Sequence, residues 1–424
     1  MNGDLGFPRI LLVTYLDVFN DNESETYTVR SFIENWPREN IFQIICEDFN
    51  SGDTGRISKN TYRLGHGDIV IGSWLIPGRR EVKTTMKSPL TKKSEKNTQS
   101  LKSSIRKTVV DLYSFLPYRY TSQLQHFIED SNPDVLYCCS ASVRMFKLCK
   151  KIAKKRKIPF IPHIMDDWPN SMYNGSPLSK PLKTYFHFYF SKIIHRAPFV
   201  YCICDLMCSE YKKRYSYDRF IPLMNSVNDY SGITIDEIKN RIIYAGSLYL
   251  ERYKSLLTIA ESLSKLNRTD IEIVVYTKHK QWEELEHFFE NYSFVRYGGF
   301  VTQSELMEQI VSSKYLLFLE SMDDEMLDYT RLSMSTKIPE YLSSQRPILA
   351  VGNLKQGSID YLYKNEAAYI ISDLANTGEV LGLLLNCIDQ NEIVSNAYSL
   401  YKKNHIKEQQ QILFLNNVLG AIKK

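Results

Sequence analysis

The segment SMSTKIPEYLSSQRPILAVG, residues 333–352, predicts a short helix followed by a buried strand. Ser335 and Thr336 can cap that helix, whose free N–H groups would receive a phosphate, and Lys337 adds a cation there. Glu340 falls one turn later on the same helical face, because residues three and four apart are neighbours on a helix. A carboxylate there can accept two hydrogen bonds from a ribose diol. In isolation, the pattern also fits a surface Lys–Glu pair on an ordinary capped helix.

Apolar runs separated by amphipathic stretches recur along the chain and predict an α/β fold. In the first half we expect strands at ILLVTY (10–15), IFQIICED (41–48), DVLYCCSA (134–141), FIPHIM (160–165) and APFVYCIC (197–204). In the second half we expect them at RIIYAG (241–246), IEIVVYT (271–277), FVRYGGF (294–300), YLLFLE (315–320), PILAV (347–351) and AYIIS (368–372). Continuous apolar runs are typical of parallel strands buried on both faces.

The length of 424 residues fits two domains of about 200 residues each better than one core. The polar segment 225–240 marks the predicted boundary, with a first domain over 1–228 and a second over 229–399. One amphipathic helix is expected over 399–424. The helix after the strand at 241–246 should bury one face made of Leu256, Leu257, Ala260, Leu263 and Leu266.

The composition, with 43% hydrophobic and 24% charged residues, is typical of a soluble globular protein. No run approaches the roughly 18 apolar residues of a spanning helix, and the N-terminus lacks the basic flank of a signal peptide. We therefore expect a cytoplasmic protein. Cys202, Cys204 and Cys208 favour buried thiols over metal ligation, because the first two share one face of a strand.

Positive charge is concentrated in segment 79–107, where ten Lys and Arg residues stand against two Glu. Such a segment implies an anionic partner, which could be a membrane leaflet, a nucleic acid or a phosphorylated substrate. A solvated loop remains the alternative. Nucleic-acid binding is disfavoured because the segment lacks interleaved aromatic residues and no recognition motif accompanies it.

Two further strand ends in the second half could contact a nucleoside diphosphate, since ligands of parallel sheets bind beyond the carboxyl ends of strands. In YAGSLYLER (244–252), Gly246 permits close backbone approach and Arg252 can fork onto phosphate oxygens. In RYGGF (296–300), the glycine pair that includes Gly299 permits close approach to a base. A common strand-ending glycine, a solvated arginine and a plain tight turn are the alternatives.

The string TKIPEYLxxxRPILA resembles the SKxxEYLAxGxPILA motif of glycosyltransferase family 4 and its GT-B relatives. YAGSLxxxR, VRYGGF, the hinge IPLMNSV (221–227) and MDDWP (165–169) also resemble family elements, in the family's order. The resemblance covers roughly residues 130–375 and is more specific in the second half of the chain.

The resemblance implies the GT-B fold, in which two Rossmann-like domains face each other across a cleft and the C-terminal helix, here 400–424, returns to the N-terminal domain. It implies transfer of a sugar from a nucleotide-diphosphate sugar to a saccharide or lipid-linked acceptor, with retention and without a metal or other cofactor. Surface polysaccharide synthesis is the implied role. Segment 79–107 would then contact an anionic membrane.

The family pattern makes Glu340 the ribose ligand and makes Arg252 and Lys337 the diphosphate ligands. The other implied donor-binding residues are Asn225, Gly246, Gly299, Ser335 and Thr336. Asp166 joins Arg252 and Lys337 as a catalytic residue, and the implied acceptor-side residues are His163, Asp166, Asp167 and Trp168. His163 also fits a core histidine and Trp168 fits packing beneath the loop.

Three positions depart from the family pattern. Leu332 stands where a Glu is usual eight residues before Glu340, so sugar contacts must come from elsewhere in the 320–335 loop. Gln345 replaces a usual glycine, and the loop after the first strand is acidic and polar instead of glycine-rich. Carboxylates available in the 320–335 loop are Glu320, Asp323, Asp324, Glu325 and Asp328.

Two other functions remain open. A nucleotide-sugar epimerase can use the same scaffold, although a small-molecule isomerase has no need of the basic segment 79–107. A basic nucleic-acid-binding protein is the second alternative.

Overall fold

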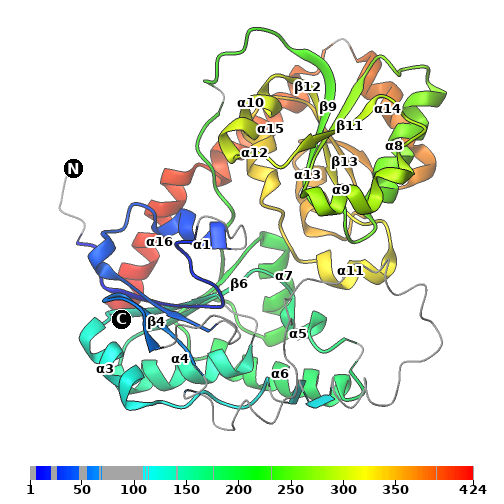
Figure 1. Cartoon of the computed structure of the whole chain (residues 1–424). Coiled ribbons are helices and arrows are strands. Elements are labelled where there is room, and N and C mark those ends of the chain that lie inside the picture. The colour runs from blue at the N-terminus through cyan, green and yellow to red at the C-terminus, as the bar shows by residue number, and fades with distance from the viewer. Residues whose placement is uncertain are drawn as a thin grey trace. The chain divides into compact units, whose positions relative to one another are not determined.

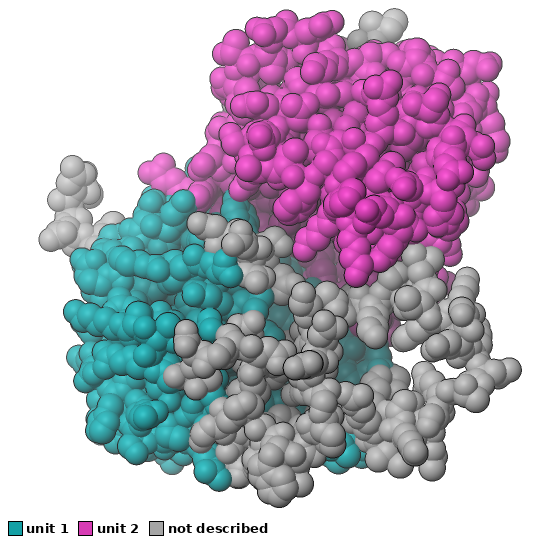
Figure 2. Space-filling model, viewed as in Figure 1, with its two compact units in different colours: residues 1–87, 94–223, 409–424 teal, residues 88–93, 224–408 magenta. Residues whose placement is uncertain are grey.

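The computed structural model describes residues 6–20, 26–46, 55–65, 68, 108–109, 111–112, 114–139, 142–174, 176–230, 232–387 and 389–423. The basic segment 79–107 therefore lies outside the described residues. The described chain forms two compact units (Figure 2). Unit 1 holds the residues up to Leu223 and those from Gln409 onward, and unit 2 holds Met224–Glu408. The units thus divide a few residues from the boundary that the polar segment predicted.

Unit 1 is built on one sheet with the strand order β3-β4-β2-β1-β5-β6-β7-β8 (Figure 1). All neighbouring strands are parallel except the β3/β4 pair. Its strands are β1 (Ile10–Thr14), β2 (Ile41–Ile45), β3 (Gly55–Arg56), β4 (Thr61–Arg63), β5 (Val135–Cys139), β6 (Phe160–Ile164), β7 (Val200–Cys202) and β8 (Phe220–Pro222). Its helices include α1 (Tyr27–Ile33), α3 (Ser122–Ser131), α4 (Val143–Arg156), α5 (Trp168–Ser171), α6 (Ser179–Ile194) and α7 (Asp205–Tyr215).

The C-terminal helix completes the core of unit 1. Phe414, on α16 (Lys407–Ile422), is fully buried and meets Tyr137 of β5 edge-on, with 5.5 Å between ring centroids. The single helix predicted over 399–424 is wrong, because α15 (Asn391–Asn404) ends before α16 begins. The break has a physical reason: the backbone around Ile406 pairs with Val227, whose N–H donates to the His405 carbonyl and whose carbonyl accepts from the Lys407 N–H. The buried His405 ring donates a hydrogen bond to the Asn225 carbonyl.

Unit 2 has a fully parallel sheet of order β11-β10-β9-β12-β13-β14. Its strands are β9 (Lys239–Ala245), β10 (Glu272–Tyr276), β11 (Val295–Gly299), β12 (Ser313–Leu319), β13 (Ile348–Val351) and β14 (Tyr369–Ile371). Its helices include α8 (Arg252–Lys265), α9 (His279–Leu285), α10 (Gln303–Val311), α11 (Asp324–Thr330), α12 (Lys337–Ser343), α13 (Gly357–Lys364), α14 (Thr377–Asn386) and α15. The chain starts at β9 in the middle, moves to one edge, then crosses to β12 and fills the other side. This is the doubly wound order of Rossmann-like domains, so the predicted α/β class is confirmed.

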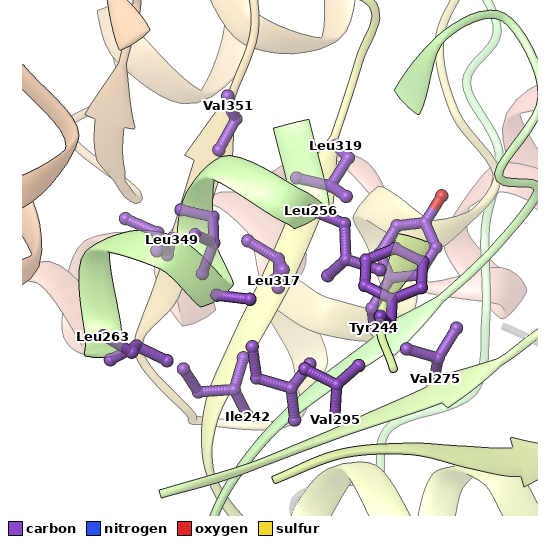
Figure 3. Close-up of a cluster of buried hydrophobic side chains, with 14 of the residues drawn as sticks. Ile242, Tyr244, Leu256, Leu263, Val275, Val295, Leu317, Leu319, Leu349 and Val351 are labelled. Carbon is purple, nitrogen blue, oxygen red and sulfur yellow. The ribbon is translucent and has the colours of Figure 1, made fainter. Parts of the chain in front are cut away.

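The core of unit 2 lies between this sheet and α8 (Figure 3). Leu256 and Leu263 of α8 are fully buried against strand residues such as Ile242 and Leu317. Leu266, predicted on the same face, is the C-cap residue of α8 and is exposed, because the helix ends before that position completes another turn.

Cys202, Cys204 and Cys208 are buried free thiols, as predicted. Within the described residues, no helix combines the length and the apolar character that crossing a membrane requires.

Gly352, which follows β13, lies in a tightly packed part of unit 2. A Cβ there would lie 2.6 Å from Ile359 Cγ1 and 2.7 Å from Gln356 Oε1. Gln356 cannot move aside easily, because its amide donates to the Ser321 carbonyl and to Thr330 Oγ1. Gly352→Ala should therefore lower the free energy of unfolding by about 1–3 kcal/mol.

The matched control is Gly420→Ala, at an exposed position of α16, where a Cβ would meet nothing within 4 Å. It should be neutral or should stabilise by roughly 0.5–1 kcal/mol, since alanine favours helix interiors. Thermal and denaturant unfolding of both variants would show the difference, and equal stability of the two would contradict the packing argument.

Candidate functional site

The crossover between β9 and β12 is the switch point of the unit 2 sheet, where ligands of doubly wound sheets bind beyond the carboxyl ends of the strands. Two charged side chains meet there. Arg252 begins α8 and Glu320 directly follows β12, and Arg252 Nη2 lies 2.6 Å from Glu320 Oε2. Both side chains are largely buried.

Electrostatics keep Arg252 charged. Burial lowers the pKa of its guanidinium, but the neighbouring Glu320 carboxylate and the Tyr244 hydroxyl raise it, and the net shift is upward. A buried cation whose charge is maintained by one carboxylate can transfer its attraction to another anion that enters the site.

The loop from β9 to Arg252 differs from the expected glycine turn. The left-handed residues are Leu250 and Glu251, with φ of 60° and 64°, and not Gly246. The Gly246 N–H donates to the Tyr276 carbonyl at 3.0 Å, so the backbone of Gly246 extends the sheet pairing. Two consecutive left-handed non-glycine residues cost on the order of 1–3 kcal/mol each, and such strain is typical of functional loops.

The second charged pair lies on α12. Lys337 Nζ is 3.0 Å from Glu340 Oε2, and Glu340 is only 4% exposed. Its other oxygen, Oε1, accepts a hydrogen bond from Gln303 Nε2 at 3.3 Å. The predicted helical neighbourhood of Lys337 and Glu340 is therefore present, and both carboxylate oxygens face polar groups instead of solvent.

The predicted cap of α12 is only half present. Ser335 Oγ accepts a hydrogen bond from the Lys337 N–H at 3.2 Å. Thr336 occupies the N-cap position but makes no capping hydrogen bond through its side chain, because its backbone already has helical angles. Ser335 thus shapes the start of α12, and the capping role predicted for Thr336 is wrong.

Tyr341 attaches α12, which carries the second charged pair, to the two strands next to the first pair. Its hydroxyl accepts from the Ala245 N–H at 3.0 Å, at the end of β9, and donates to the Leu317 carbonyl of β12 at 3.3 Å. Because Tyr341 immediately follows Glu340, this contact attaches α12 to the two strands of the switch point.

Asn225 supports the same region from the start of unit 2. Its side-chain amide donates to the Met334 carbonyl at 3.3 Å, just before α12. Its own carbonyl accepts from His405 Nδ1 at 2.6 Å, and Tyr361 Oη donates to His405 Nε2 at 2.9 Å. The predicted hinge residue Asn225 therefore positions the Ser335–Lys337 turn.

Gly299 lies at the end of edge strand β11 and is separated from β9 by β10. Its φ of +95° requires glycine. A Cβ on Gly298 would lie 2.7 Å from the Tyr276 ring, so that glycine is needed for packing. These constraints account for both glycines without a base, which favours the tight-turn interpretation.

In unit 1, Asp167 is the centre of a buried network. Arg214 contacts both carboxylate oxygens at 2.6 Å and 3.0 Å, and Tyr211 Oη and Asn170 Nδ2 donate at 2.9 Å and 2.8 Å. Burial would raise the pKa of Asp167, but the hydrogen bonds and charge of Arg214 together with the other donors lower it. Because its oxygens are occupied inside the fold, Asp167 holds the loop after β6 in place. The predicted acceptor contact by Asp167 does not fit this geometry.

His163, on β6, is fully buried in unit 1. Its Nδ1 lies 2.6 Å from Tyr137 Oη, and its ring packs against Phe32 and Tyr201. Burial lowers its pKa to about 3, so the ring is neutral. The structure thus supports the core interpretation of His163 and not the acceptor-side one.

Asp166 and Trp168 are partly exposed in the MDDWP segment, as is Met165. The Trp168 N–H donates to the Asp166 carbonyl at 2.7 Å, which fixes the turn into α5. Asp166 and Trp168 therefore remain the acceptor-side candidates of unit 1.

Sequence reasoning missed three supporting residues, namely Gln303, Tyr341 and His405. Tyr341 was in the quoted motif, but a buried tyrosine reads as core volume until its hydroxyl partners are known. Glu320 was singled out as a possible sugar contact, and in the structure it is the partner of Arg252. Asp323, from the same set, accepts from the Glu325 N–H and caps α11.

No family model matches the sequence, and no curated protein matches it. Solved structures do match. HepE from Anabaena in complex with UDP superposes with a TM-score of 0.62 over 97% of this chain and 100% of that chain, at 8% identity. A glycosyltransferase from Rickettsia africae gives 0.62 over 99% and 100%, at 13% identity. S. aureus TarM gives 0.50 over 67% of this chain at 16% identity, and this chain covers 54% of TarM, about half its length.

These proteins are GT-B glycosyltransferases. The chain therefore has the GT-B fold, as the motifs predicted, with a Rossmann-like sheet in each unit.

His405 gives the supporting network a pH dependence. Burial lowers its pKa to about 4, and the smaller effect of the Asn225 hydrogen bond opposes this. The unfolded histidine gains a proton below about pH 6.5, whereas the folded one does so only near pH 4. The contribution to stability is therefore complete above pH 6.5 and falls by about 1.4 kcal/mol per pH unit between these values.

We expect His405→Gln to flatten this part of the profile in denaturant unfolding measured from pH 7 to pH 4. His126→Gln, at an exposed position on α3, is the control and should leave the profile unchanged. A wild-type slope in His405→Gln would contradict the assignment.

Proposed function

We propose that the chain is a glycosyltransferase that uses a nucleotide-diphosphate sugar as donor and binds it in unit 2. The observation that carries this proposal is the pairing of Arg252 with Glu320 and of Lys337 with Glu340, attached to one switch point through Tyr341. The fold neighbours support it, since HepE was solved with UDP and the pneumococcal transferase GtfA with UDP and GlcNAc.

In this proposal, Arg252 and Lys337 bind the diphosphate and Glu340 accepts hydrogen bonds from the ribose diol. Lys337 is the more exposed of the two cations and would exchange its contact with Glu340 for a phosphate oxygen. Glu340 would then receive the ribose hydroxyls as donors while Gln303 keeps its orientation. Ser335 and Asn225 shape the turn, and Thr336 contributes through its backbone at the start of α12.

The chemistry breaks the bond between the anomeric carbon and the diphosphate oxygen, which leaves positive charge on the sugar and negative charge on the leaving group. Arg252 and Lys337 stabilise that leaving group electrostatically, which is the largest contribution such a site can make. We further propose retention by front-face attack without a metal. The acceptor hydroxyl bonds to the same face of the anomeric carbon and its proton passes to the leaving diphosphate.

On the acceptor side, the proposal assigns Asp166 to the reacting centre and Trp168 to sugar stacking. The acceptor is a saccharide or a lipid-linked saccharide of surface polysaccharide synthesis on the cytoplasmic side of the membrane, and segment 79–107 contacts the anionic leaflet. These assignments rest on the resemblance of the MDDWP segment and on the charge of segment 79–107.

Donor binding can be tested by thermal shift with UDP, GDP, CDP and dTDP. At about 100 times its Kd, the cognate nucleotide should stabilise the protein by about 2.7 kcal/mol through mass action. Glu340→Ala should remove most of that shift, because the ribose hydroxyls lose the carboxylate that accepts their hydrogen bonds. Glu290→Ala, at an exposed position of unit 2, should retain it.

A lack of response to all four nucleotides, or an unchanged response in Glu340→Ala, would refute the donor site. Conversion of the sugar nucleotide to an isomer without any acceptor would favour an epimerase.

Removal of either cation should slow transfer. Lys337→Ala and Arg252→Ala should each lower kcat by about 10²–10³, because the leaving diphosphate loses a preorganised partner. Arg252→Lys keeps the charge but loses the planar fork, and should fall between these variants and wild type. Initial rates with the cognate donor measure the effect.

Arg296→Ala is the matched control, because Arg296 forms an exposed ion pair with Glu272 on the sheet edge. It should change kcat little. Equal rates in Arg296→Ala, Lys337→Ala and Arg252→Ala would exclude a role for the two cations.

A further inference from the structure

Helices α4 and α6 pack against each other in unit 1 (Figure 1) and carry positive charge without any carboxylate. Both helices are described in full, and neither contains Asp or Glu. The two helices carry ten cations, whereas the net charge of the whole chain is +5. The remaining residues therefore carry a net negative charge. The ten are Arg144, Lys147, Lys150, Lys151, Lys154, Lys155, Arg156, Lys180, Lys183 and Lys192. All except the buried Arg144 contribute to the surface that we call the α4/α6 face.

Aromatic rings lie among these cations. Phe188 and Tyr185, one helical turn apart on α6, are 55% and 41% exposed. Lys192 Nζ lies 3.9 Å from the Phe188 ring centroid, and Lys147 Nζ lies 5.5 Å from that of Tyr185. The α4/α6 face thus presents apolar rings and ammonium groups side by side.

Residues 117–121, which lead into α3, form a hollow of about 500 Å³ with α4, next to this face. Lys147 and Lys151 of α4 line it together with Tyr118, Arg119 and Tyr120. Lys155 Nζ lies 4.1 Å from the Tyr120 ring centroid. The hollow therefore opens among cations and aromatic rings, and it has room for a phosphate headgroup.

The cations also repel one another. Burial lowers the pKa of Lys150, and the charges of Arg196, Lys192 and Lys154 lower it further. A face with this much unbalanced like charge gains most from a partner that supplies many anionic groups over an area.

We propose that the α4/α6 face binds the surface of an anionic phospholipid bilayer. Lysine side chains reach phosphate groups at the lipid surface, while exposed aromatic rings insert at the headgroup level. A single-stranded nucleic acid would instead require a groove that follows its backbone with rings available for stacking. Tyr185 and Phe188 project from the outer side of one helix, which suits a flat partner. The α4/α6 face contains no residue of segment 79–107, and its role does not depend on the transferase activity.

The test is cosedimentation of the full chain with large vesicles, either of phosphatidylcholine alone or with about one third phosphatidylglycerol. We expect binding to the anionic vesicles, weakened by added salt because charge contacts at a surface are screened. Lys154→Gln/Lys155→Gln should weaken binding about 30-fold, at about 1 kcal/mol per lysine. Phe188→Ala should weaken it about tenfold through lost apolar insertion.

The matched control is Lys212→Gln/Lys213→Gln, which removes the same charge from exposed lysines near the end of α7 in the same unit. It should change binding by less than about threefold. Unchanged thermal stability of each variant would show that the fold persists.

Three outcomes would overturn the proposal. The first is equal loss in the α4 and α7 pairs, which would indicate general charge attraction. The second is loss in Lys92→Gln/Lys93→Gln without loss in the α4 pair, which would place the contact in segment 79–107 alone. The third is salt-sensitive retention on DNA without vesicle binding, which would favour a nucleic-acid partner.

Discussion

The hydroxyl of Tyr341 is the contact on which the geometry of the candidate site depends. It bonds at once to the end of β9 and to β12, and so attaches α12 to the switch point of the unit 2 sheet. This link adds to the packing of α12, whose Ile338 and Leu342 side chains are fully buried, and it relates Lys337 and Glu340 to the strand ends beside Arg252. A helix of seven residues has little stability of its own, so its position must come from such tertiary contacts.

The two ion pairs of the candidate site orient their side chains more than they stabilise the fold. The Glu320 carboxylate more than offsets the effect of burial on the pKa of Arg252, and Gln303 holds the carboxylate of Glu340. Such pairs contribute little net stability, since desolvation offsets most of the Coulomb attraction. In the proposed donor site, the value of these pairs lies in preorganisation, because the carboxylates orient the two cations before an anion enters.

The sequence predicted the parts of the fold that local periodicity controls. Apolar runs marked the strands of both units, and the TKIPEYL motif placed Lys337 and Glu340 on one helical face. The partners of these residues could not be predicted, because they come from distant parts of the chain. Glu320 is 68 residues from Arg252, and Asn225 is 180 residues from His405. The break before α16 could not be predicted either, because the amphipathic pattern continues across His405. The core and acceptor-side interpretations of His163 could not be separated from the sequence, because its strand neighbours do not reveal which face of the sheet is covered by α16.

The position of α16 has a consequence for how the chain reaches its native state. Unit 2 is formed from the contiguous stretch Met224–Glu408, whereas the core of unit 1 includes Phe414 and Val418. During synthesis, the ribosome releases most of unit 1 long before the helix that fills its core. Unit 2 can complete its fold first, and unit 1 must wait with an open apolar face until α16 emerges. An apolar face that stays exposed on the first half of a nascent chain is the kind of surface that chaperones bind.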